Sequence, residues 1–546
     1  MDPAGSNANP HFDVIVIGAG FAGLHMLDRA RALGYSTKVF DAASDVGGVW
    51  YWNRYPGARC DVESLQYSYS FSHELEQEWI WTEKYAAQPE ILAYIQHVAD
   101  RFDLRRDIQF DTRIKSAIFD ETVGRWELET DDGQRIFGRF CVMATGALSI
   151  PRLPDIRGIE SFAGHVYHTG AWPHEGVDFT GLRVGVIGTG SSGIQAIPAI
   201  ARQAEKVVVF QRTANFSIPA WNERLKPEIQ QAWKRAYREH RSRARELGTL
   251  YEFSDKAASQ VSEQEREREY AARWKKGGVN FVHSFNDLMV NQASNDTIAE
   301  FVRGRIRAVV QDPAVAESLC PKDHPLGSKR ICVDTGYYET YNRPNVKLVD
   351  LKKTPAQEVV PTGIRTADTL YEFDAMVCAT GYDALTGAVL NIVIRGRKGQ
   401  ELTKKWAHGP RTYLGLMTNG FPNMFIITGA GSPSVLVNMI VGIEHHVEWI
   451  IDCLEHLRRL GRDTIEPTRE AEDGWVEHVN KAASRTLFPK ANSWFLGANI
   501  PGKPRVFMPY VAKIGIYRGE CQAVADDGYT GFTLQSAHEE PDREGA

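Results

Sequence analysis

The chain has 546 residues, of which 43% are hydrophobic and 24% are charged, and its formal net charge is −6 at pH 7. This length exceeds what one hydrophobic core usually supports, so we expect two or three domains. The acidic balance argues against a nucleic-acid-binding protein. No apolar run is long enough to span a bilayer, and the first residues are neither basic nor apolar, so we expect a cytoplasmic protein without a membrane partner.

The seven cysteines are scattered along the chain, and no two of them are spaced as C-x-x-C. An odd number without paired spacing argues against a disulfide framework, a zinc site or a redox-active dithiol. We therefore expect reduced thiols and no metal centre.

A dinucleotide-binding unit is predicted near the start, in "FDVIVIGAGFAG". The continuous apolar run suits a parallel strand that is covered on both faces. Gly18, Gly20 and Gly23 follow in G-x-G-x-x-G spacing: the first turns tightly, the second admits a pyrophosphate, and the third allows close helix–strand packing. Asp41 ends the next predicted strand, where a carboxylate can bond ribose hydroxyls. The simpler alternative, a glycine-rich turn, does not explain the order strand, glycines, helix, strand and acid.

The same unit recurs in "LRVGVIGTGSSG", with Gly188, Gly190 and Gly193 in the same spacing. Its second strand, "KVVVFQR", ends on Arg212 and Thr213 instead of an acid. A carboxylate suits a free 2′-hydroxyl, whereas an arginine suits a 2′-phosphate. The first unit is therefore predicted to bind FAD and the second NADPH; alternatively, Arg212 is a solvated surface charge.

The predicted fold is α/β, with two Rossmann-like domains for FAD and NADP and a helical insertion. Helix-forming and charged residues follow "SIPAW" and predict the insertion, whose charge runs are typical of solvated helix faces. The pieces "VMATGALS" and "VCATGYDA" mark the strand ends where the chain crosses between domains. The tail after about Glu539 is expected to be disordered. The assigned ranges are 1–149 and 381–546 for the FAD domain, 150–218 and 328–380 for the NADP domain, and 219–327 for the insertion within the NADP domain.

Between the two units, "FAGHVYHTGAWP" matches the fingerprint F-x-G-x-x-x-H-x-x-x-W-P. The pattern G-G-x-W-x-x-x-x-Y-P-G-x-x-x-D is also present, from Gly47 to Asp61. On these motifs the chain resembles the type I Baeyer–Villiger monooxygenases over nearly its whole length. The resemblance implies that the fingerprint links the domains, and that His168 and Trp172 influence how the NADP domain sits over the flavin. The alternative for His168 is a packed loop histidine.

The resemblance also implies a reaction. NADPH reduces FAD, the reduced flavin captures O₂ as a C4a-peroxide, and this peroxide converts a ketone into an ester or lactone. The partners would be O₂ and a cyclic, aromatic or bulky ketone, with no obligate protein partner and a monomer favoured. The family's active-site arginine matches Arg330, in "GSKRICVD", and its neighbouring acid matches Asp61. A guanidinium is always charged, and a carboxylate orients its fork. The alternative for this pair is a structural salt bridge.

The remaining site residues carry over in the same way. Lys329 would join Arg212 on the 2′-phosphate, and Trp494 would cover the nicotinamide nucleotide unless it is a core tryptophan. The segment "GAGSPSVLVNM" resembles an active-site loop of the family, so the ketone pocket would be lined by Ser434, Val435, Leu436 and Met439. The full cofactor-binding set is Gly18, Gly20, Gly23, Asp41, Gly48, Trp50, Asp61, Gly188, Gly190, Ser191, Gly193, Arg212, Thr213, Lys329 and Trp494.

Two other functions use a similar pair of nucleotide units. A flavin-containing monooxygenase that oxygenates nitrogen or sulfur would lack the trailing Trp-Pro and the pair Arg330–Asp61. A flavin-binding sensor would bind FAD without turnover. A flavin disulfide reductase is excluded by the absence of C-x-x-C.

Overall fold

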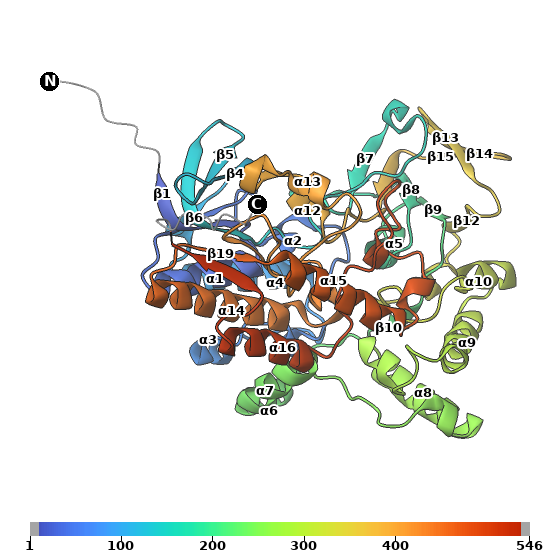
Figure 1. Ribbon diagram of the computed structural model, residues 1–546. Coiled ribbons are helices and arrows are strands. Elements are labelled where there is room, and N and C mark those ends of the chain that lie inside the picture. Colours follow the sequence, from blue (N-terminus) through green and yellow to red (C-terminus); the bar gives the residue numbers. More distant parts are fainter. Residues whose placement is uncertain (1–9, 537–546) are drawn as a thin grey trace.

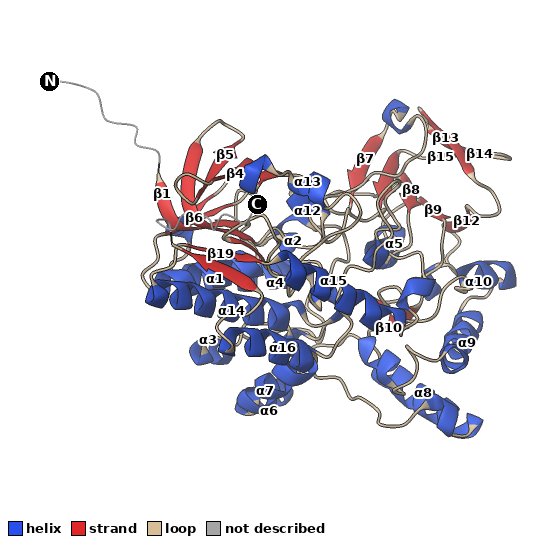
Figure 2. Ribbon diagram, viewed as in Figure 1, coloured by secondary structure: helices blue, strands red, loops and turns tan. Residues whose placement is uncertain are grey.

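The computed structural model describes residues 10–536, so the tail predicted to be disordered lies outside the described residues. Two separate sheets with parallel strands lie at opposite sides of the molecule, with helices around them (Figures 1 and 2). This arrangement confirms the predicted α/β class with two Rossmann-like units. Within the described range, no helix is both long and apolar enough for a membrane span.

The first sheet has eight strands and is built around β1 (His11–Ile17). Its continuous apolar run is explained by burial on both faces. Val14 and Val16 pack with the helices α1 and α14, while Ile15 and Ile17 pack with β4 and β5 on the other face. β2 and β6 pair with β1 in parallel. The other elements of this unit are β2 (Thr37–Phe40), β3 (Ile108–Gln109), β4 (Ile114–Asp120), β5 (Arg125–Thr130), β6 (Arg135–Met143), β17 (Val393–Arg395), β18 (Met424–Ile426), α1 (Phe21–Ala32) and α14 (Met439–Leu460).

The second sheet has five parallel strands in the order β12-β9-β8-β16-β7. Its central strand, β8 (Arg183–Ile187), leads into α5 (Ser191–Ala201), as β1 leads into α1. The other strands are β7 (His165–His168), β9 (Lys206–Gln211), β12 (Val346–Asp350) and β16 (Ala375–Cys378). A small antiparallel sheet beside it contains β13 (Ala356–Val360), β14 (Gly363–Thr366) and β15 (Leu370–Glu372).

Shorter elements complete the two units. The pair β10 (Ser217–Pro219) and β11 (Cys332–Asp334) closes the base of the insertion, and β19 (Thr464–Pro467) pairs with β20 (Phe532–Gln535). The remaining helices are α2 (Val49–Trp52), α3 (His73–Glu78), α4 (Gln88–Arg101), α11 (Tyr337–Thr340), α12 (Gly387–Leu390), α13 (Leu402–Lys405), α15 (Arg469–Ser484) and α16 (Ile514–Asp526).

The segment predicted as a helical insertion is helical, and it contacts both units. It contains α6 (Pro227–Arg235), α7 (Tyr237–Leu247), α8 (Glu263–Lys276), α9 (Gln292–Val309) and α10 (Pro313–Leu319). The first two helices pack on the first unit, where Arg241 donates to Glu76 at 2.7 Å and Gln230 donates to the carbonyl of Trp81 at 2.7 Å. The last three helices pack on the second unit, as Figure 1 shows.

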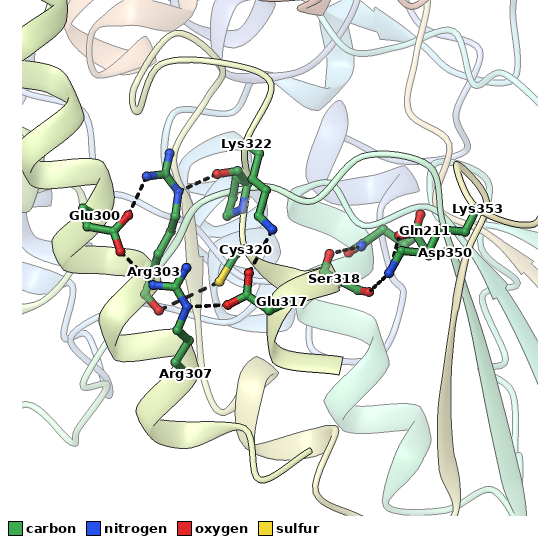
Figure 3. Close-up of polar contacts among 11 residues, drawn as sticks. Gln211, Glu300, Arg303, Arg307, Glu317, Ser318, Cys320, Lys322, Asp350 and Lys353 are labelled. Carbon is green, nitrogen blue, oxygen red and sulfur yellow. Dashed lines mark hydrogen bonds and ion pairs between the residues drawn. The ribbon is translucent and has the colours of Figure 1, made fainter. Parts of the chain in front are cut away.

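Figure 3 shows how the end of the insertion is attached to the second sheet. Gln211, the last residue of β9, donates to the carbonyl of Ser318 at 2.7 Å, and Lys353 donates to the Ser318 hydroxyl at 3.0 Å. An ion pair of Arg307 with Glu317 connects α9 to α10, and a second pair of Arg307 with Glu300 lies within α9. The end of β9, where Arg212 follows, is therefore fixed against α10.

The glycine spacing of the first unit is required by close backbone packing. A Cβ atom on Gly23 would lie 1.8 Å from the carbonyl oxygen of Gly18. We predict that Gly23→Ala lowers the free energy of unfolding by about 1–3 kcal/mol or more, because helix and loop must separate. Gly474→Ala in α15 is the matched control, since its Cβ would meet nothing within 4 Å and alanine favours helix. Thermal unfolding of both variants checks this, and equal melting temperatures would contradict it.

Candidate functional site

One cavity of about 1050 Å³ lies where the two units meet. The loop after β1 and the loop after β8 both line it, together with residues of the fingerprint connector and of the C-terminal part of the chain. In parallel α/β sheets, ligands bind at the carboxyl ends of the strands. Both predicted nucleotide sites therefore open into the same space.

The first glycine loop has the geometry of a phosphate cradle. Gly18 has a φ of +111°, and Gly20 precedes the N-terminus of α1, which has no side-chain cap. The first N–H groups of α1 are thus open to an anion in the cavity. Gly20 lies against Gly48, which has a φ of +55°, so the backbones of the two segments approach closely. Trp50 completes this wall, and its indole donates to the Tyr67 hydroxyl at 3.2 Å.

Asp41 lines the cavity at the end of β2, as expected for a ribose ligand. Its carboxylate also accepts hydrogen bonds from the backbone N–H groups of Ala19 and Ala43, at 2.5 and 2.8 Å. Burial raises the pKa of this carboxyl above its usual value, and the two N–H groups oppose the shift. Asp41 therefore also stabilises the glycine loop, while its bond to ribose stays a prediction.

The second glycine loop repeats the first. Gly188 has a φ of +105°, and a Cβ on Gly193 would lie 2.2 Å from the carbonyl oxygen of Gly188. Gly190 faces open space, and Ser191 begins α5 at the cavity wall. Gly23 and Gly193 do not line the cavity, because each packs helix against strand, which is the role predicted for the third glycine.

Arg212 and Lys329 lie together at the end of the cavity next to β9, and Thr213 lines the same part. Neither cation forms an ion pair with a carboxylate within residues 10–536. Burial lowers the pKa of Lys329, and the charge of Arg212 acts in the same direction against the opposing charge of Asp323. Two neighbouring cations that form no ion pair within residues 10–536 make a site suited to a phosphate group.

The centre of the cavity contains an ion pair between the two units. Arg330 donates from Nε and Nη2 to the two carboxylate oxygens of Asp61, each at 2.8 Å, and from Nη1 to the carbonyl of Val435. The side chains are 26% and 23% exposed, so the pair faces the cavity. Burial acts to lower the pKa of Arg330, but the Asp61 carboxylate more than offsets it, so the pKa lies above its ordinary value. The guanidinium is a permanent, oriented cation.

Two of the four predicted pocket residues, Val435 and Met439, line the cavity. Ser434 and Leu436 do not. Ser434 is buried, and its hydroxyl donates to the carbonyl of Thr428 at 3.0 Å, while Leu436 packs in the apolar cluster that also contains Val435 and Met439. Residues Ser434–Leu436 form a short 3-10 helix. Trp494 lines the cavity and is partly exposed, which argues against a core tryptophan.

The fingerprint segment, residues 162–173, lies close to the places where the chain passes from one unit to the other, near 149 and near 381. His168 accepts a hydrogen bond at Nδ1 from the N–H of Gly170, at 2.9 Å, so Nε2 carries the proton and donates to the carbonyl of Arg152, at 3.2 Å. Thr380 donates to the same carbonyl. Trp172 is buried, and its ring packs 5.5 Å from that of Tyr167. Neither His168 nor Trp172 lines the cavity, which agrees with a conformational function.

Several residues at this junction could not be identified from motifs. Tyr382, in the second crossing, donates to Asn53 of the first unit at 2.7 Å, and Gln195 of α5 bonds Tyr55 at 2.8 Å. The segment "VCATGYDA" marked the second crossing but not the function of its tyrosine. These contacts join residues far apart in the chain, so spacing carries no signal for them.

The comparisons agree with this geometry. A family model described as pyridine nucleotide-disulphide oxidoreductase matches residues 15–276. The chain is 43% identical to a Baeyer-Villiger monooxygenase of Pseudooceanicola batsensis, covering 95% of each, and 42% identical to a phenazine N-monooxygenase of Lysobacter antibioticus, covering 97% and 98%. A solved structure of oxidised steroid monooxygenase bound to NADP is 54% identical, with a TM-score of 0.92, covering 96% of this chain and all of that one. All seven cysteines are buried free thiols, so the disulphide chemistry in the family model's description has no counterpart here.

His168 makes a testable contribution to the pH dependence of stability. Burial lowers its pKa below the usual value, so folding favours the neutral ring. Its stabilising contribution is present above the unfolded pKa of about 6.5 and is lost as the pH falls through the lowered pKa, at most about 1.4 kcal/mol per pH unit. His168→Gln preserves a donor and an acceptor without titrating. We predict that its melting temperature falls less than that of the wild type between pH 6.5 and 5; parallel curves would contradict this.

Proposed function

The chain belongs to the Baeyer–Villiger monooxygenase family, and on that premise we propose that the ion pair Arg330–Asp61 is the charged centre of its catalytic site. The protein is an oxidoreductase that uses FAD, NADPH and O₂ to convert ketones into esters or lactones. One observation supports the assignment of the centre most directly. The oriented guanidinium lies in the single cavity that both nucleotide loops line.

The residues around the cavity fit both cofactors. The cradle of Gly18, Gly20 and Gly48 leaves no room for a Cβ atom where backbone segments meet, as a bound pyrophosphate requires. Arg212 and Lys329 supply the unpaired charge that a 2′-phosphate needs, with Ser191 at the N-terminus of α5. When bound and reduced by NADPH, FAD would activate O₂, which would supply the oxygen atom that the ketone accepts.

We assign the following work to the chain's own residues. Arg330 stabilises negative charge that develops near the reacting oxygen and polarises the ketone carbonyl. Asp61 orients the guanidinium through two hydrogen bonds. Val435 and Met439 form an apolar wall that excludes water from the ketone, and Trp494 covers the nicotinamide nucleotide.

The substrate is proposed to be a cyclic, aromatic or otherwise bulky ketone. The cavity lining includes Ile427, Val435, Val437 and Met439, which offer apolar surface for a large carbon skeleton, and the carbonyl of Val435 accepts from Arg330. One similar solved structure is named as a steroid monooxygenase. Both nucleotide loops and the pair Arg330–Asp61 belong to the same chain, so a monomer is proposed to suffice, and the seven free thiols support a reducing, cytoplasmic location.

The domain boundaries are proposed as first assigned, with one addition. The FAD domain comprises 1–149 and 381–546, the NADP domain 150–218 and 328–380, and the insertion 219–327. Within the insertion, α6 and α7 bind the FAD domain, and α8 to α10 bind the NADP domain.

Nitrogen oxygenation is the second candidate, because one similar relative is named as a phenazine N-monooxygenase. The deciding experiment measures NADPH consumption with a panel of cyclic and aromatic ketones and with phenazine, followed by mass spectrometry. Ketone-dependent consumption with a product heavier by one oxygen atom supports our proposal. NADPH consumption with phenazine but with no ketone would instead indicate nitrogen oxygenation. Bound FAD with no NADPH consumption on any substrate would indicate a flavin-binding sensor.

The phosphate site predicts a preference for NADPH over NADH. Arg212→Ala removes a charge-assisted contact worth about 1.5–3 kcal/mol, which corresponds to roughly 10- to 150-fold weaker NADPH binding. Lys329→Ala is expected to weaken binding by the same amount or less. Binding of NADH, which lacks the 2′-phosphate, serves as the internal control. If both variants retain full discrimination between the two nucleotides, the site is wrongly assigned.

Arg330→Ala is predicted to separate the two halves of the reaction. Flavin reduction by NADPH requires that the nicotinamide and flavin rings lie against each other. It does not depend on a cation beside the ketone, so anaerobic bleaching of the flavin should persist. Ester formation should fall by at least about 100-fold, the cost of removing one preorganised electrostatic group. Asp61→Ala should act in the same direction but more mildly. Normal ester yield from Arg330→Ala would exclude our assignment, and loss of both halves would indicate a structural function.

A further inference from the structure

The segment 55–61 connects the two units at both of its ends. At one end Asp61 binds Arg330, which enters from the second unit beside β11. Tyr55, at the other end, and Arg59, two residues before Asp61, both meet α5, the helix that begins at the second glycine loop. A close approach of backbones marks this second contact: a Cβ on Gly57 would lie 2.4 Å from the carbonyl oxygen of Gln195.

Gln195 forms the polar contacts at that end. Its Oε1 accepts from the Tyr55 hydroxyl at 2.8 Å and from the N–H of Arg59 at 3.4 Å, and its Nε2 donates to the carbonyl of Arg59 at 3.1 Å. The side chain is only 8% exposed. A buried amide with both ends bonded is costly to leave unpaired, so these bonds specify one relative placement of α5 and the segment.

The segment itself is fixed to the first unit. The N–H of Cys60 donates to the carbonyl of Ala86 at 3.1 Å, and the N–H of Gln88 donates to the carbonyl of Ala58 at 2.9 Å. The guanidinium of Arg59 donates to Glu83 at 2.7 Å. Gln195 therefore places the second unit against a rigid edge of the first.

We propose that Gln195 is a positioning residue that sets the orientation of Arg330 for oxygen transfer, an inference that rests on the proposed function. Gln195 bonds the N–H and the carbonyl of Arg59, two residues before Asp61, so it fixes the stretch of chain that carries the Asp61 carboxylate.

The test compares the wild type with Gln195→Met, which preserves length and removes all three hydrogen bonds. Gln203→Met is the matched control, since this glutamine lies just beyond the same helix on the surface. We expect Gln195→Met to bind FAD and to be reduced by NADPH within about threefold of the wild-type rate. Ester formed per NADPH consumed should fall about three- to tenfold, the equivalent of losing buried hydrogen bonds, with hydrogen peroxide released instead.

A second readout does not depend on turnover. Hydrogen–deuterium exchange of the peptide containing 55–61 should be about three- to tenfold faster in Gln195→Met, with or without NADP, and unchanged in Gln203→Met. If Gln195→Met fails to fold, Gln195→Glu serves in its place, since it preserves the acceptor for Tyr55 and loses the donor to Arg59. The inference would be overturned if the variant formed as much ester per NADPH consumed as the wild type and if hydrogen–deuterium exchange of 55–61 were also unchanged. A wild type that forms no ester with any ketone would instead contradict the proposed function.

Discussion

The site depends on one ion pair between two units, each of which is built on its own sheet. Arg330 and Asp61 come from different units, yet their two hydrogen bonds are each 2.8 Å long. The pair is partly buried, and removing one partner would leave the other charge without its counter-charge in the cavity. The units must therefore be placed accurately, and much of the junction can be understood as serving that placement.

The two nucleotide loops share one cavity for a topological reason. In each unit the glycine loop follows the carboxyl end of a central parallel strand, which is where α/β sheets bind ligands. Because the carboxyl ends of both central strands open into the same cavity, two nucleotides can bind next to each other there. Beside the first chain crossing, the neutral ring of His168 donates to the carbonyl of Arg152 and so fixes the local path of the chain.

Local motifs allowed much of this fold to be predicted from the sequence. The features that could not be predicted depend on contacts between residues far apart in the chain. The spacing of Gly18, Gly20 and Gly23 predicts strand, turn and helix because each glycine has a local steric reason. The pairing of Arg330 with Asp61 was expected from family resemblance alone, since no periodicity connects them. Ser434 was wrongly expected to line the pocket, because a turn reverses its side chain toward Thr428.

The packing of α6 and α7 on the first unit is another contact that could not be predicted from the sequence. Composition predicted helices in the insertion but not which core they cover, because that choice depends on partners such as Glu76 for Arg241. Gln195 lies in an ordinary apolar helix pattern, and only the folded chain brings it to Tyr55. Contacts of this kind depend on tertiary structure, which spacing along the chain does not record.

The most direct test of the central claim is a double-mutant cycle on Arg330 and Asp61, with Arg330→Ala, Asp61→Ala and the double variant. The measured quantity is ester formed per NADPH consumed with a ketone that the wild type converts. If Asp61 acts by orienting the guanidinium, its substitution has little further effect once Arg330 is absent, which gives a coupling energy within about 0.5–3 kcal/mol. Independent, additive losses would contradict an account in which the two side chains act as one unit.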